Sequence, residues 1–177
     1  MLPNYPLSSS KVQDNKTSNT RELTDPKDVP AKGRLLGLDP GTRKVGVAVS
    51  DEIQFTVRPV EVLTRGSWKT LLGKINELIA GFDAVALIIG LPLAFDGSES
   101  EMSEEAREMA RKLSLSLEIP VILHDERLST YTARGYLWKR GKDEKEMAAR
   151  LDAEAAAVIL SDFIEARKTL LERGSDG

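Results

Sequence analysis

The first apolar pattern along the chain is short and alternating, as in β-strands. An apolar run over 35–39 leads through an Asp-Pro-Gly turn into valines at every second position over 45–49, which predicts a hairpin. A third extended segment over 55–63 is interrupted by Pro59, which indicates an irregular or edge strand. The domain therefore opens with three strands.

After residue 67 the apolar positions fall three and four residues apart, which is the spacing of helices packed on a core. The pattern predicts helices over 68–81, 102–117, 129–139 and 151–172, and strands over 84–89 and 120–123. Helices and strands therefore alternate at first, and the chain ends with two helices. Gly81 is placed to end the first helix, and a charged loop through Lys145 precedes the last one. The pattern predicts an α/β fold whose mixed five-stranded sheet has three antiparallel strands, then βα units, with helices on both faces.

The first 33 residues differ from the rest because they contain only eight apolar residues and show no periodicity. Such a segment buries too little apolar surface to fold, so we expect residues 1–33 to be a flexible N-terminal extension. The predicted domain covers residues 34–173, and residues 174–177 form a polar C-terminal stub.

Composition narrows the chemistry that the domain can carry out. The chain has no cysteine and a single histidine, His124, so thiol catalysis and multi-histidine metal sites are excluded and any metal must be bound by oxygen atoms. No run of eighteen uncharged apolar residues occurs, so the sequence predicts a cytoplasmic protein with no membrane span. The net charge of −3 by itself indicates no partner.

Three carboxylates are placed to meet at one edge of the predicted sheet. Asp39 ends the first strand, and Glu126 follows the fifth strand directly. If those two strands are parallel, their carboxyl ends share the edge at which α/β sheets place their sites. Asp152 lies on the last helix at the spacing of Ala156 and Ile159, so it shares the face that packs on the sheet.

Three carboxylates without a nearby histidine or cysteine favour Mg²⁺ or Mn²⁺, and two such ions can hydrolyse a phosphodiester. Each acid also has a simpler interpretation. Asp39 alone fits a turn residue, Asp152 an N-cap, and Glu126 a surface charge paired with Arg127. Only their joint placement favours a catalytic set.

Four segments, in order, resemble the YqgF/RuvX-like family of pre-16S rRNA nucleases, also described as Holliday junction resolvase homologues. They are Gly37-Leu-Asp39-Pro-Gly41-Thr with the hairpin up to Asp51, Ile89-Gly-Leu-Pro-Leu93 with Asp96-Gly-Ser98, Asp125-Glu126-Arg127-Leu-Ser-Thr130, and Leu151-Asp152-Ala-Glu-Ala-Ala156. The resemblance covers about residues 34–172. It implies an RNase H-like fold in which Asp39, Glu126 and Asp152 bind Mg²⁺ or Mn²⁺ and catalyse the reaction.

The resemblance also implies a nucleic-acid substrate, with the 5′ end of precursor 16S rRNA preferred and branched DNA possible. A segment over 127–150 carries seven basic and three acidic residues among aromatic ones, which suits a phosphate backbone but also fits an ordinary basic helix face. The candidate nucleic-acid-binding residues are Arg43, Lys44, Arg127, Arg134, Lys139, Arg140 and Lys142.

Two other classes of function stay open at this stage. A catalytically silent nucleic-acid or ribosome-assembly binder could use the same basic segment. An actin-like nucleotide phosphotransferase is suggested by the Asp39-to-Thr42 turn, although that fold needs two lobes and the predicted domain supplies one. A homodimer would suit a junction resolvase, but the sequence shows no interface.

Overall fold

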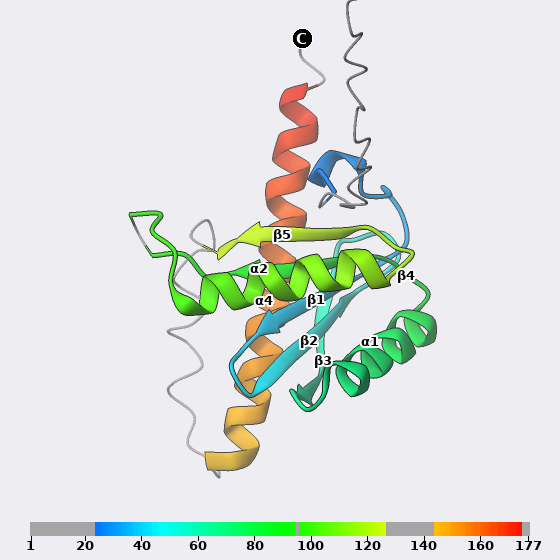
Figure 1. Cartoon of the computed structure of the whole chain (residues 1–177). Helices are drawn as coiled ribbons and strands as arrows, with labels where there is room; N and C mark the ends of the chain where they lie inside the picture. Colours follow the sequence, from blue (N-terminus) through cyan, green and yellow to red (C-terminus); the bar gives the residue numbers. More distant parts are fainter. Residues whose placement is uncertain (1–23, 95, 127–143, 175–177) are drawn as a thin grey trace, which may run out of the picture.

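A computed structural model of the 177-residue chain describes residues 24–94, 96–126 and 144–174 (Figure 1). Its centre is one five-stranded sheet with the strand order β3-β2-β1-β4-β5. The strands are β1 (Arg34–Pro40), β2 (Lys44–Ser50), β3 (Val57–Thr64), β4 (Ala84–Leu91) and β5 (Val121–Asp125). β2 is antiparallel to β1 and β3, whereas β1, β4 and β5 are parallel to one another.

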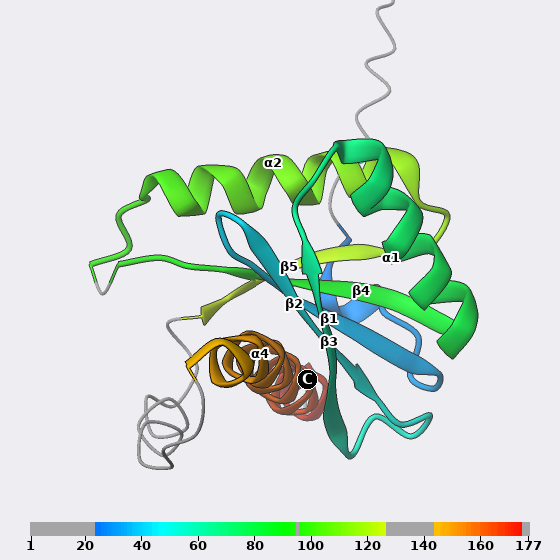
Figure 2. The same cartoon turned by 90° about the horizontal axis from the view of Figure 1, so that it is seen from below.

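The sheet is covered by α1 (Trp68–Phe82) and α2 (Glu101–Ser116) on one face and by α4 (Glu144–Gly174) on the other (Figure 2). This arrangement confirms the predicted fold class, an RNase H-like α/β fold with a mixed sheet. β3 lies at the edge of the sheet, and its register shifts beside Pro59, as the proline predicted.

Two predicted helix boundaries are wrong. The last helix begins at Glu144 instead of residue 151, so Lys145 lies in a helix and not in a loop. The added residues are mostly glutamate, lysine, methionine, alanine and arginine, which are good helix formers. The first helix continues through Gly81 to Phe82, and Asp83 ends it in the left-handed conformation with φ of 50°. The predicted helix over 129–139 lies outside the described residues.

The N-terminal segment contacts the domain before the predicted boundary at residue 34. Residues Pro26–Asp28 form a 3-10 helix, η1, and Val29 is buried in the core beneath α4. The buried guanidinium of Arg167 donates to the carbonyls of Pro26 and Val29. The contact depends on backbone carbonyls and on one valine side chain. Such a contact produces no periodic pattern of apolar residues, so the sequence does not predict it. Residues 26–29 therefore pack on the domain, and the predicted flexibility of residues 1–23 concerns a segment outside the described residues.

None of the helices in the described parts of the chain combines the length and the apolar character needed to cross a membrane.

Candidate functional site

The parallel strands direct two of the candidate carboxylates to one edge of the sheet. Leu36 and Leu38 of β1 belong to the core under α1 and α2, whereas Leu35 packs in the core under α4. Because side chains alternate along a strand, Asp39 also faces α4. Glu126 directly follows β5, and β1, β4 and β5 run parallel, so the carboxyl ends of these strands lie at the same edge as predicted.

Glycines in the strands bring α4 unusually close to the sheet. A Cβ atom at Gly37 would lie 2.9 Å from the Cβ of Leu160, and one at Gly46 would overlap the backbone carbonyl of Asp152. Gly46 is the register partner of Asp39 across the β1–β2 ladder. The missing side chain at Gly46 therefore lets the helix place Asp152 beside Asp39.

A cleft of about 200 Å³ opens where these elements meet. Its lining combines two acids, two bases and the hairpin turn: Asp39, Gly41, Thr42, Arg43, Lys44 and Asp152. Both aspartates are half-buried, whereas Arg43 and Lys44 are exposed at the rim. The structure thus brings four of the sequence-predicted residues into one cleft. Two of them supply carboxylate oxygens, and the other two supply basic side chains that suit a phosphate. Because α4 begins at Glu144, Asp152 is not the N-cap of its helix.

Glu126 lies on the same face of the sheet but outside the lining of this cleft. Its Oε1 atom is buried and fills the space beside Gly90 where a side chain would otherwise stand, next to Ile159 of α4. β4 separates β1 from β5, so the two strands are roughly 10 Å apart. Among the described residues, no three acidic or histidine side chains are close enough together to hold one metal ion. The shared role of Asp39, Glu126 and Asp152 stays a prediction.

His124 is part of the core beneath α4. It is 7% exposed, and its ring meets that of Phe163 edge to face at a centroid distance of 5.7 Å. Burial lowers the pKa of His124, although the charge of Asp125 acts in the opposite direction. The neutral ring therefore packs against the helix, and we assign it no role in chemistry.

The other predicted nucleic-acid-binding residues cannot be placed relative to the cleft. Arg127, Arg134, Lys139, Arg140 and Lys142 lie outside the described residues. Their proposed contact with a phosphate backbone stays a prediction.

Sequence reasoning missed two features that shape the cleft. The first is the close approach of α4, for which glycines inside predicted strands are the available signal. The second is Arg65, which follows β3 and whose guanidinium donates to the carbonyl of Gly41 at 2.8 Å and to Glu105 at 2.6 Å. No sequence spacing connects Arg65 with α2, because the contact spans 40 residues.

Comparison with known proteins places these residues in a family context. Residues 33–166 match a family model described as "RuvX: Holliday junction resolvase". A protein of Anaeromyxobacter sp. (strain K) is 40% identical over 134 residues, which cover 76% of this chain and 98% of that protein. A protein of Azotobacter vinelandii is 38% identical over 133 residues, covering 75% and 94%. Both are named "Putative pre-16S rRNA nuclease".

Solved structures are less similar. RuvC of T. thermophilus, in complex with a Holliday junction substrate, has a TM-score of 0.45 at 14% identity, covering 78% of this chain and 96% of that chain. The yeast mitochondrial Holliday junction resolvase has a TM-score of 0.46 at 11% identity, covering 83% and 85%.

Proposed function

We propose that this chain, which belongs to the RuvX family, is a divalent-metal-dependent nuclease that hydrolyses phosphodiester bonds. The observation that carries the proposal is the cleft in which Asp39 and Asp152 lie beside Arg43 and Lys44. Carboxylates can hold a metal ion there, while the two bases can bind the phosphate on which it acts.

The donor set of the cleft fits Mg²⁺ or Mn²⁺. Magnesium commonly takes one or two protein carboxylates and completes its shell with water and substrate phosphate, and Asp39 and Asp152 supply two carboxylates. A bound ion would activate water and stabilise the leaving oxygen. Glu126 lies at the same edge and face of the sheet but outside this cleft, so we propose it as a carboxylate for a second ion, separate from the ion that Asp39 and Asp152 would hold.

The basic residues of the turn have a separate task. Arg43 and Lys44 are exposed at the rim, where they can bind a phosphate backbone without regard to sequence. We extend this binding surface to Arg127, Arg134, Lys139, Arg140 and Lys142. If Arg43 and Lys44 each make one contact, replacing both with glutamine should lower the slope of log affinity against log salt by about 1.4 for a single strand. The exposed Lys69 of α1 is the control position, and its replacement should leave the slope unchanged.

The names of the relatives direct the choice of substrate to precursor 16S rRNA. We further propose that the chain processes the 5′ end of this precursor and acts in the cytoplasm. Branched DNA is the second candidate because the family model carries the description of a Holliday junction resolvase. Both substrates present the same phosphodiester to the cleft, so an experiment has to separate them.

The test is incubation of the full chain with precursor 16S rRNA, an unrelated single-stranded RNA and a four-way DNA junction, each with Mg²⁺, Mn²⁺ or EDTA. We expect cleavage of the precursor with either metal and none with EDTA. Cleavage of the junction alone would transfer the proposal to DNA. Binding of the precursor without cleavage under any condition would contradict the proposal and leave a binding protein.

A further inference from the structure

The turn that carries Arg43 and Lys44 is held by one hydrogen bond within the turn and by others from Arg65. The amide of Gly41 donates to the carbonyl of Lys44 at 2.9 Å, and a Cβ atom at Gly41 would lie 2.8 Å from that same carbonyl oxygen. Arg65 then contacts the turn twice. Its amide donates to the carbonyl of Arg43 at 2.9 Å, and its guanidinium donates to the carbonyl of Gly41 at 2.8 Å.

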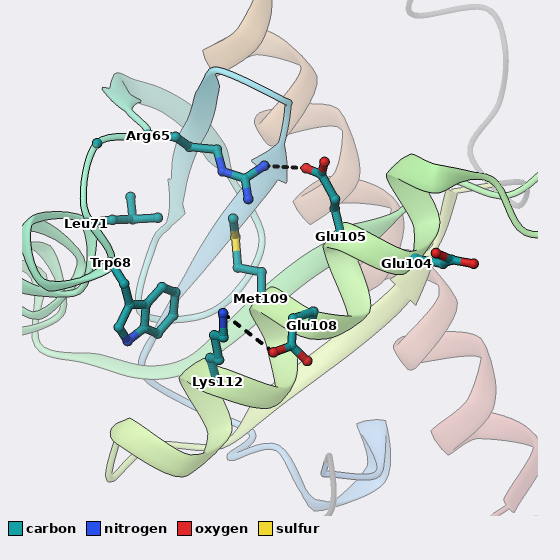
Figure 3. A pocket seen from close by; sticks show the side chains of 9 residues that line it. Arg65, Trp68, Leu71, Glu104, Glu105, Glu108, Met109 and Lys112 are labelled. Carbon is teal, nitrogen blue, oxygen red and sulfur yellow. Dashed lines mark hydrogen bonds and ion pairs between the residues drawn. The ribbon is translucent and has the colours of Figure 1, made fainter.

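Glu105 of α2 fixes the other side of the Arg65 guanidinium. The same nitrogen, Nη1, that donates to Gly41 lies 2.6 Å from Oε2 of Glu105, and the two side chains are 25% and 39% exposed. Figure 3 shows Arg65 and Glu105 pointing toward each other at the edge of a pocket of about 410 Å³ between the start of α1 and α2. The neighbours of Glu105 along α2, Ala106 and Met109, are buried against the sheet, so Glu105 is held by a rigid element.

We propose that Arg65 is a positioning residue of the nuclease site: held by Glu105, it fixes the turn so that Arg43 and Lys44 stand at the rim of the carboxylate cleft. The inference rests on the proposed function. Asp39 lies in the β1–β2 ladder and is held independently of Arg65. Loss of Arg65 should therefore weaken substrate binding much more than the chemical step.

The direction of the effect at Glu105 separates positioning from direct phosphate binding. If Arg65 bound phosphate itself, removal of Glu105 would free the guanidinium and remove a nearby negative charge, so nucleic acid would bind more tightly. If Arg65 positions the turn, Glu105→Ala should weaken binding even though it removes a repulsive charge. Glu104 lines the same pocket on the exposed side of α2 and provides a control with the same change of charge.

The experiment measures kcat and KM for cleavage of precursor 16S rRNA by full-length variants. Loss of a hydrogen bond to a charged group changes an affinity by about tenfold or more. We therefore expect Arg65→Gln to raise KM about tenfold and to leave kcat within about twofold of the wild type. Glu105→Ala should raise KM about threefold, whereas Glu104→Ala should not raise it. In the Arg65→Gln/Glu105→Ala double variant, the change in log KM should be smaller than the sum of the two single changes. Arg107→Gln, which breaks the ion pair between Arg107 of α2 and Glu99 before the helix, controls for the loss of one positive charge.

The outcomes distinguish this inference from the proposed function. If Arg65→Gln raises KM no more than Arg107→Gln does, or if Glu105→Ala lowers KM, the positioning role is overturned while the nuclease proposal stands. If the wild-type chain cleaves none of the nucleic acids, the proposed function fails, and this inference fails with it. Should Arg65→Gln fail to fold, Glu105→Ala against Glu104→Ala still decides the question.

Discussion

The two faces of the sheet are built from side chains of different size. Branched residues fill the face under α1 and α2: Leu36, Leu38, Val45, Val47, Val49, Leu87 and Ile89. Glycine and alanine predominate at the centre of the face under α4: Gly37, Gly46, Ala48, Ala86 and Gly90. The glycines of the second face allow a helix backbone to lie almost against the strands. The candidate site is on the second face, where close approach places Asp152 beside Asp39.

The faces also differ in the ionisable groups that they bury. Among the described residues, the buried ionisable side chains are His124 and Arg167, and both lie on the α4 side. Arg167 is satisfied by Gln54 at 2.9 Å and by carbonyls of the N-terminal segment. The α4 face therefore adds the polar contacts of Arg167 and the close approach at its glycines to its apolar packing.

Two adjacent residues of β2 that face opposite sides of the sheet test this difference between the faces. We expect Gly46→Val to cost about 4 kcal/mol of unfolding free energy, because its side chain would overlap the Asp152 backbone and displace α4. Val47→Ala, at a fully buried position of the other face, should cost about 2 kcal/mol. Urea unfolding followed by circular dichroism measures both. A cost near zero for Gly46→Val would mean that α4 can move away freely and that the close approach is unimportant.

A smaller effect should follow removal of the N-terminal segment from the α4 face. Deleting residues 1–33 removes buried Val29 and two acceptors of Arg167, so we expect a loss of about 2–3 kcal/mol. Deleting residues 1–23 retains both contacts and should leave the thermal midpoint unchanged. If neither deletion lowers the stability, the contacts of residues 24–33 contribute nothing and the domain begins at residue 34.

The smallest effect concerns pH and His124. Burial lowers the pKa of His124 in the folded protein, so the unfolded chain takes up a proton first as the pH falls. The stabilising contribution of the neutral ring is present above about pH 6.5 and is lost as the pH falls below that value. His124→Leu should therefore show a shallower loss of stability between pH 7 and pH 5 than the wild type. Unfolding curves at several pH values test this, and parallel curves would contradict it.

The fold was largely predictable because the spacing of apolar residues records which face each side chain buries. Valines at alternating positions defined β2, and the Asp-Pro-Gly turn defined the hairpin. The exact ends of the helices were less predictable. The sequence predicts that α1 ends at Gly81, but Asp83 is the residue that ends it in the left-handed conformation. Good helix formers before residue 151 extend α4 back to Glu144.

The candidate site was predicted in part. The strand end and the helix face predicted that Asp39 and Asp152 would lie together, and both line the cleft, whereas their catalytic role stays a prediction. Glu126 reached the same edge but not the same cleft, since β4 separates its strand from β1. Arg65 could not be found from sequence, because its contacts with Gly41 and Glu105 join segments whose proximity appears only in three dimensions.

Two neighbouring acids of α4 show whether the cleft on the α4 face carries the proposed chemistry. Asp152 lines the cleft, whereas Glu154, two residues later and also half-buried, does not. We expect Asp152→Asn to lower the single-turnover rate of precursor 16S rRNA cleavage in Mg²⁺ by about a thousandfold or more while the protein stays folded and still binds RNA. Glu154→Gln should retain a rate close to that of the wild type. A near-wild-type rate for Asp152→Asn would contradict the account and place the chemistry elsewhere on the molecule.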